Sequence, residues 1–124
     1  MVMKGTSQAL GARGEDLAVQ YLKKKGFKVI ERNYHCSAGE IDLIARDKDT
    51  LVFVEIKARS SADYGLPQEF VDRFKQRKMI EAARFFMAER RVTEDIPARF
   101  DVVAIQLTPT GPKIELIKNA FQGE

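Results

Sequence analysis

The alternation of apolar and polar positions predicts a β-hairpin near the middle of the chain. Residues 39–47 alternate between the two kinds of position, and residues 51–58 form a run rich in Val, Ile and Phe. Such runs are typical of half-buried and fully buried strands. The polar residues from Asp47 to Thr50 favour a turn, so we expect two antiparallel strands joined by a tight loop.

The length of that loop determines which side chains face each other. If the loop has two residues, Asp47 pairs with Thr50, and the numbers of paired residues sum to 97 along the hairpin. Asp42 then lies directly opposite Glu55. A four-residue loop keeps this register, whereas an odd number of loop residues shifts it by one. We therefore expect Asp42 and Glu55 to be cross-strand neighbours.

The same register places Glu40 opposite Lys57, on the face that carries Asp42 and Glu55. The second strand is apolar on both faces, so we expect Glu55 and Lys57 to be central and partly enclosed, where unpaired charge is costly. From spacing alone, an alternative stays open: these charges can belong to the solvated face of an amphipathic hairpin.

Two carboxylates on opposite residues of a hairpin repel unless a cation lies between them, because their Cβ atoms are about 4.5–5.5 Å apart. Mg²⁺ or Mn²⁺ can supply that charge, and such an ion can activate water to attack a phosphodiester. Asp42 and Glu55 are therefore candidate metal ligands. Lys57 can position the water or stabilise negative charge on the phosphate, which completes the expected catalytic set.

A third carboxylate lies on the first predicted helix. Helical spacing puts Glu15 in line with Ala18, Val19 and Leu22, on the apolar stripe, so we expect it to point inward toward the site. The alternative is a glutamate in the first helical turn that is favoured by the helix dipole, and the neighbouring Asp16 fits that description.

The rest of the pattern predicts the element order α-β-β-β-α-β-β. Gly26 favours the end of the first helix, and Pro67 favours the start of a second one. The expected elements are a helix over about 9–25, a strand over 27–34, the hairpin, a helix over about 67–91, and a final hairpin with strands at 99–107 and 113–117.

The second helix combines an apolar stripe with many cations. The expected stripe comprises Leu66, Phe70, Phe74, Ile80, Ala83, Phe86 and Met87, and the cations include Arg73, Lys75, Arg77, Lys78, Arg84, Arg90 and Arg91. A net charge of +3 fits a polyanionic partner. Lys75 and Lys78 are candidates for contact with nucleic-acid phosphates, although for each single cation a solvated helix face is the favoured interpretation.

A polar loop at residues 60–65 precedes this helix, beside the expected site. Tyr64 in the loop is a candidate for stacking on an unpaired base. Gln68 and Glu69, which follow the loop, are candidate auxiliary groups, as is Glu40. On a later strand Asp101 can be an extra acid, but a structural role is simpler.

Length and composition fit one domain of 124 residues, with a core at about 10–117 and flexible tails at 1–8 and 118–124. No run approaches the ~20 apolar residues that span a membrane, and the first residues lack the apolar core of a signal peptide. Cys36 is the only cysteine, so no intramolecular disulfide forms, and with His35 it cannot assemble a zinc site. The cytoplasm is the default location.

Several motifs in order resemble those of the YraN-like family of small bacterial proteins. They are Gly11-x-x-Gly14-Glu15, Glu31-Arg32-Asn33-Tyr34, Gly39-Glu40-Ile41-Asp42, Phe53-Val54-Glu55-Ile56-Lys57 and Arg99-Phe100-Asp101-Val102. The resemblance covers residues from about 10 to 117. The Gly11-x-x-Gly14 element lacks the Lys-Ser/Thr of a phosphate-binding loop and instead favours close backbone packing.

That family is similar to the restriction-endonuclease-like superfamily with its PD-(D/E)xK motif, and to archaeal Holliday-junction resolvases. The resemblance implies an α/β fold with a central mixed sheet flanked by helices. It also implies Glu15, Asp42 and Glu55 as metal ligands and Lys57 as the catalytic lysine. In this chain Ile41 replaces the proline of the motif before Asp42.

The sequence therefore predicts a Mg²⁺- or Mn²⁺-dependent endonuclease that acts on DNA, with branched or structured DNA as the expected substrate. A homodimer would suit a two-fold symmetric junction. Two alternatives stay open: a nucleic-acid-binding or assembly module that keeps the fold without chemistry, and a nuclease that acts on RNA.

Overall fold

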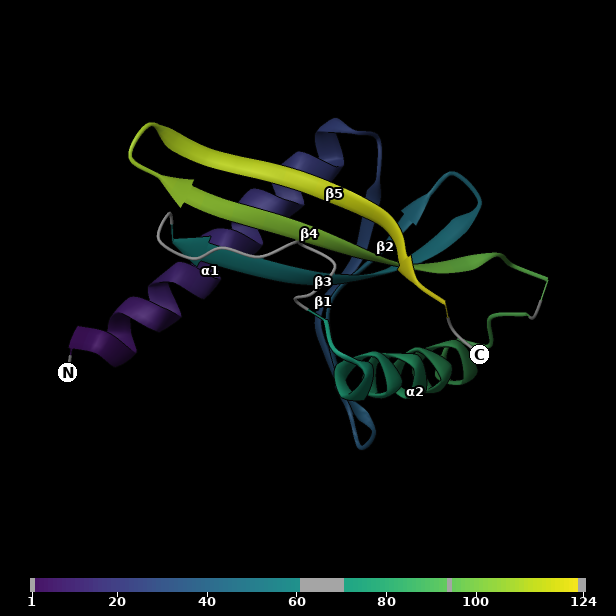
Figure 1. Cartoon of the computed structure of the whole chain (residues 1–124). Helices are drawn as coiled ribbons and strands as arrows, with labels where there is room; N and C mark the ends of the chain where they lie inside the picture. Colours follow the sequence, from purple (N-terminus) through teal and green to yellow (C-terminus); the bar gives the residue numbers. More distant parts are fainter. Residues whose placement is uncertain (1, 61–70, 94, 123–124) are drawn as a thin grey trace.

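The computed structural model describes residues 2–60, 71–93 and 95–122, and side chains from residue 12 onward (Figure 1). Within these ranges the order α-β-β-β-α-β-β is confirmed. The elements are α1 (Val2–Lys24), β1 (Lys28–Cys36), β2 (Gly39–Asp47), β3 (Thr50–Ser60), α2 (Arg73–Glu89), β4 (Ala98–Thr108) and β5 (Gly111–Phe121). In the described ranges, no helix has the length and apolar character needed to cross a membrane.

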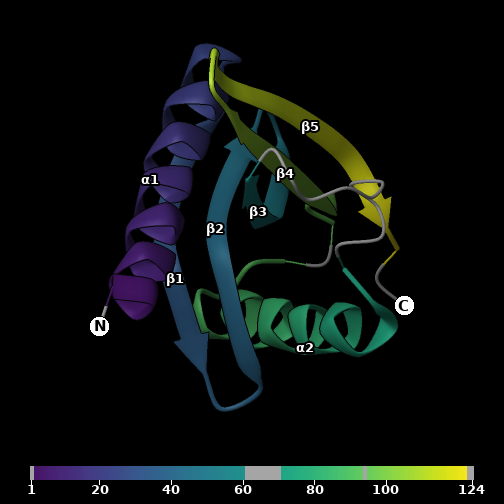
Figure 2. The same cartoon turned by 60° about the vertical axis from the view of Figure 1, so that its left-hand side comes forward.

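The described strands form one mixed sheet in the order β1-β2-β3-β4-β5. Neighbouring strands are antiparallel except β3 and β4, which are parallel and are connected through α2. The two helices cover opposite faces of the sheet (Figures 1 and 2). The expectation of a central mixed sheet flanked by helices is therefore confirmed.

Each face of the sheet has its own apolar core. On the α1 face, Ala18 and Leu22 pack against strand residues such as Val52 and Val103. A side chain at Gly14 would bring its Cβ to 2.9 Å from Ala58 Cβ, so this glycine allows α1 to approach β3 closely. The expectation of close packing at this position is confirmed.

On the other face, α2 buries a narrow stripe against the sheet, made of Met79, Ala82, Ala83 and Phe86. The sequence-based stripe was wrong at Phe74, which is 63% exposed. Phe74 lies five positions before Met79, a spacing that rotates it by about 140° away from the buried direction. Leu66 and Phe70 of the expected stripe lie outside the described residues.

The final hairpin is longer than predicted. Its second strand continues from Ile117 to Phe121, whose buried ring stacks on Phe100 with 4.8 Å between the centroids. Residues 118–121 therefore belong to β5 and extend the core beyond its expected end at about residue 117. Residues 2–8 likewise belong to α1.

The central hairpin has the predicted register over part of its length. The pairs run from Asp47–Thr50 to Leu43–Val54, and each pair of numbers sums to 97. Beyond Leu43, β2 leaves β3 but remains paired with β1 as far as Gly39. Figure 2 shows this β1–β2 arm extending alongside α2.

Candidate functional site

The candidate site lies at the fork where β2 separates from β3. Asp42 is the first residue of β2 past the last β2–β3 pair. Its Oδ2 accepts a hydrogen bond of 2.8 Å from the backbone N–H of Ile56, so the side chain bridges the two strands where backbone pairing has stopped. This bond fixes the half-buried carboxylate beside Glu55.

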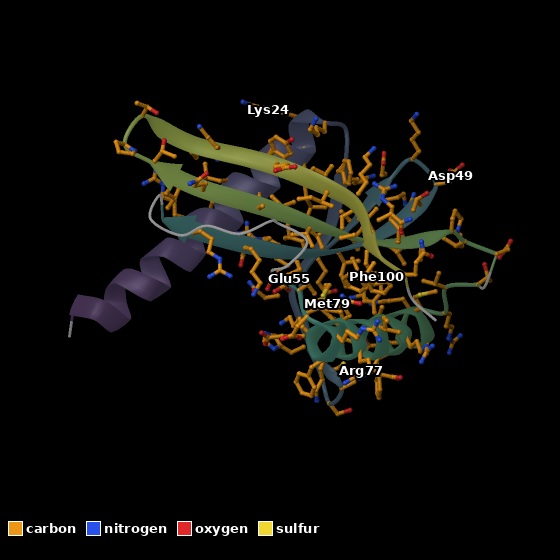
Figure 3. All side chains as sticks on the ribbon, viewed as in Figure 1. Lys24, Asp49, Glu55, Arg77, Met79 and Phe100 are labelled. Atoms are coloured by element: carbon orange, nitrogen blue, oxygen red, sulfur yellow. The ribbon has the colours of Figure 1, made fainter. Side chains whose placement is uncertain are left out.

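Glu55 occupies the α2 face of β3, two residues beyond the buried Phe53. Figure 3 shows it between the sheet and the start of α2. It is 3% exposed. Burial and, to a smaller extent, the negative charge of Asp42 raise the pKa of Glu55 to about 7, against the opposing effect of Lys75 and Lys57. Asp42 and Glu55 are therefore electrostatic neighbours. The expected cross-strand pair between them does not form, because the β2–β3 pairing ends one residue earlier, at Leu43–Val54.

Two lysines approach the same oxygen of Glu55 from different elements. Lys57 Nζ on β3 lies 3.3 Å from Oε2, and Lys75 Nζ on α2 lies 3.7 Å from it. Each lysine side chain is about one-third exposed. The cations thus stand between the buried carboxylate and solvent, where a phosphate can reach them.

The second oxygen of Glu55 has a different environment. Oε1 is buried, and no hydrogen-bond partner for it occurs among the described residues. A buried carboxylate oxygen without a partner is costly, and a cation satisfies it. This orphaned oxygen beside a second carboxylate fits a divalent metal ion.

The set of acidic ligands is small. Within the described ranges, no group of three or more His, Cys, Asp or Glu side chains converges on one point. Mg²⁺ is usually held by one or two carboxylates, while waters and substrate phosphate complete its octahedron. Asp42 and Glu55 therefore fit Mg²⁺ or Mn²⁺ as a two-carboxylate site.

Glu15 does not join this pair. Its Oε1 accepts hydrogen bonds from Arg32 Nε at 2.9 Å, Arg32 Nη2 at 2.7 Å and Asn33 Nδ2 at 3.2 Å. Arg32 also bonds Asp16 at 2.9 Å. Because α1 lies on the face of the sheet opposite α2, its glutamate meets β1 and not Glu55.

Glu40 is also separate from the site. It was expected opposite Lys57, but this pairing is wrong because β2 and β3 have already diverged. Glu40 Oε2 instead lies 3.2 Å from Nδ1 of His35 on β1, and both side chains are exposed.

The other candidates fall into three groups. Tyr64, Gln68 and Glu69 lie outside the described residues. Lys78 is exposed, with Nζ 5.5 Å from the ring centroid of Phe74. Asp101 is completely buried, where it accepts bonds from Arg99 and from the backbone N–H of Asn119, an arrangement that supports the structural interpretation.

Sequence reasoning assigned Lys75 to phosphate contact and missed its position beside Glu55. The signal was present, because Lys75 lies four residues before Met79 and seven before Ala82. It therefore belongs to the inward stripe of α2. A lysine on an otherwise apolar stripe indicates an acidic partner on the opposing surface.

Comparisons with known proteins agree on one family. Residues 14–105 match the model of the uncharacterised protein family UPF0102. A UPF0102 protein from Geobacter sulfurreducens is 49% identical over 117 residues, which cover 94% of this chain and 91% of that protein. A UPF0102 protein from Caldanaerobacter subterraneus is 44% identical over 121 residues, which cover 95% and 98%.

Proposed function

We propose that this chain, which belongs to the UPF0102 (YraN-like) family, is a divalent-metal-dependent endonuclease that hydrolyses phosphodiester bonds in DNA, preferentially branched or structured DNA. One observation carries the proposal. Glu55 is buried beside Asp42, with one oxygen lacking a partner among the described residues and two lysines at the other. A purely structural buried acid is instead expected to be fully satisfied, as Asp101 is.

In this proposal Asp42 and Glu55 hold the cation, and the Ile56 N–H keeps the Asp42 carboxylate turned toward Glu55. When bound, Mg²⁺ or Mn²⁺ supplies Lewis acidity and lowers the pKa of coordinated water. Burial and the nearby charge of Asp42 raise the pKa of Glu55, and a cation held by the two carboxylates would lower it again.

The lysines act on the substrate. Negative charge grows on the phosphate oxygens as water attacks phosphorus, and a positioned ammonium stabilises that charge more than it stabilises the ground state. Lys57 reaches the phosphate from the strand, and Lys75 reaches it from the helix. With a cation held by the two carboxylates, both lysines would be available to bind the phosphate instead of Glu55 Oε2.

A cleavage assay tests the proposal. Duplex, flap, single-stranded and four-way-junction DNA, together with matched RNA, are incubated with the full chain in Mg²⁺, in Mn²⁺ or in EDTA. We expect metal-dependent cleavage of structured DNA that Asp42→Asn abolishes. Glu40→Gln is the matched control, because it removes a nearby carboxylate that is exposed and paired with His35.

Two outcomes would favour the alternatives. Cleavage of RNA but not DNA would assign the same site to an RNA-directed nuclease. Binding of branched DNA without cleavage in either metal, unchanged by Asp42→Asn, would make the chain a non-catalytic nucleic-acid-binding module.

A further inference from the structure

The solvent side of α2 carries a row of arginines. Arg73, Arg77 and Arg84 are four and seven residues apart, so they lie within about 40° of one another around the helix axis. All three are exposed, and Figure 3 shows Arg77 on the side of α2 away from the sheet. The row spans about 16 Å at 1.5 Å per residue.

A groove runs beside this row, between α2 and the end of β5. The arginines line it together with Gln76, Ile80, Glu81 and Gln122. Glu81 is its one acid in the described residues, and it bonds Arg84 at 2.9 Å on the open surface. Exposed pairs of this kind contribute little to stability, so this one acid neutralises little of the charge of the row. The groove is therefore complementary to a chain of negative charges.

An exposed aromatic ring stands next to the row. Phe74 follows Arg73 directly and is 63% exposed, with the Lys78 ammonium 5.5 Å from its ring centroid. The ring is largely exposed and lies at the same end of α2 as Lys75, which approaches Glu55. Cations along a groove with an open aromatic beside them are the elements that bind single-stranded nucleic acid, because any base can stack on such a ring.

We propose that α2 binds an unpaired nucleic-acid strand, with its phosphates along Arg73, Arg77 and Arg84 and one base stacked on Phe74. This inference rests on the proposed function and specifies its substrate: the bound arm is single-stranded and is guided along the helix toward Lys75. Because Arg73 and Phe74 lie at the same end of α2 as Lys75, which approaches Glu55, cleavage is expected where the unpaired arm meets the rest of the substrate.

A second copy of this chain is the main rival occupant of the surface. Phe85, 48% exposed on the same flank as Phe74, would enlarge such an apolar contact. In a two-fold interface through α2, however, each arginine row would face the partner's row, and like charges brought together cost several kcal/mol. Charge therefore favours a polyanion over a second copy.

Binding measurements in EDTA test the inference without cleavage. Fluorescence anisotropy compares a labelled 20-nucleotide single strand of mixed sequence with its duplex over a range of salt concentrations. Phe74→Leu keeps apolar bulk but removes the ring, and Phe74→Trp restores a ring. Arg77→Ala removes one cation of the row, and Arg91→Ala, an exposed arginine beyond α2, is the matched control.

We expect the wild type to bind the single strand more tightly than the duplex. Phe74→Leu should weaken single-strand binding roughly 5- to 100-fold, with Phe74→Trp close to wild type. Arg77→Ala should weaken it and reduce the slope of log affinity against log salt by about 0.7, whereas Arg91→Ala should leave the slope unchanged.

Three results would overturn the inference: preference for the duplex, wild-type affinity in Phe74→Leu, or equal effects of Arg77→Ala and Arg91→Ala.

Other outcomes identify what fails. If the wild type sediments as a dimer, and Phe74→Leu sediments as a monomer but binds the single strand as the wild type does, the surface belongs to a second copy of the chain instead. If the variants behave as expected but no DNA or RNA is ever cut, the strand-binding surface stands and the nuclease proposal fails. If DNA is cut and neither Phe74→Leu nor Arg77→Ala changes binding or cleavage, the nuclease proposal stands and the strand-binding surface fails.

Discussion

The Asp42 carboxylate accepts a hydrogen bond from the backbone N–H of Ile56 at 2.8 Å, directly past the last backbone pair between β2 and β3. This contact lets β2 turn away toward α2 without leaving the Ile56 donor unpaired. It also fixes Asp42 beside the buried Glu55. The same hydrogen bond therefore stabilises the divergence of the two strands and positions Asp42 in the candidate metal site.

Divalent ions should stabilise the fold through Asp42 and Glu55. At ten times its dissociation constant, a ligand that binds only the native state adds about 1.4 kcal/mol, which raises the melting temperature of a chain this size by several degrees. Calorimetry with Mg²⁺ or Mn²⁺, against NaCl at matched ionic strength, should show this shift in the wild type but not in Asp42→Asn.

Glu15→Gln provides the control for that experiment. The family resemblance implied Glu15 as a ligand, yet its carboxylate is bonded to Arg32 and Asn33. The variant should therefore retain the metal-induced shift. Loss of the shift in Glu15→Gln would mean that α1 rearranges to bring this carboxylate to the metal.

Glu55 should make the metal-free protein less stable as pH rises. Its pKa is raised from 4.5 to about 7 in the folded state, so folding favours the protonated form. This stabilisation is complete below about pH 4.5 and is lost as pH rises through about 7. At about 1.4 kcal/mol per pKa unit, the loss amounts to a few kcal/mol.

Urea unfolding in EDTA across this pH range measures the effect. Because Glu55→Gln cannot ionise, its free energy of unfolding should lack this decline and exceed that of the wild type at pH 8. Parallel pH profiles for the two proteins would contradict a raised pKa at Glu55.

Lysine substitutions should separate chemistry from binding. Lys57→Ala and Lys75→Ala should lower the single-turnover cleavage rate about 10²- to 10³-fold, because both ammonium groups stand at the Glu55 carboxylate. Lys78→Ala, on the same helix but exposed, should leave the rate near wild type. If Lys75→Ala weakened DNA binding at an unchanged rate, Lys75 would be only a phosphate contact, as the sequence first suggested.

Gly14→Ala should destabilise the contact between α1 and β3. The added Cβ would lie 2.9 Å from Ala58 Cβ, and overpacking costs about 1–3 kcal/mol, against a gain of about 1 kcal/mol in helix propensity. In an Ala58→Gly background the clash is relieved and the propensity gain should remain. If the effects of Gly14→Ala and Ala58→Gly on the free energy of unfolding are simply additive, the clash is absent and α1 has shifted away from β3.

Asp101→Ala should damage stability without a direct effect on the metal site. Asp101 is fully buried and accepts bonds from Arg99 and the Asn119 N–H, so its removal leaves Arg99 partly uncompensated and should cost about 3–5 kcal/mol. Chemical denaturation measures this cost. The metal-induced rise in melting temperature should persist in the variant, and its absence would connect Asp101 to the site.

The sequence by itself determined features that depend on local periodicity. Alternation identified the strands, and the parity of the Lys48-Asp49 loop predicted the register that is observed from Asp47–Thr50 to Leu43–Val54, one residue short of Asp42 and Glu55. A strand has a side-chain period of two, so a short loop transmits the register to every pair of the hairpin. The apolar run around Glu55 likewise indicated its burial.

Only the tertiary structure decided which surfaces meet. It separated Glu40 from Lys57, because β2 leaves β3 after Leu43 and continues paired with β1 alone, in contact with α2. It also set the ion pairs of Glu15 with Arg32 and of Lys75 with Glu55, since the two helices pack on opposite faces of the sheet. Periodicity defines the faces of one element, but the partner of each face is set by contacts between residues far apart in the chain.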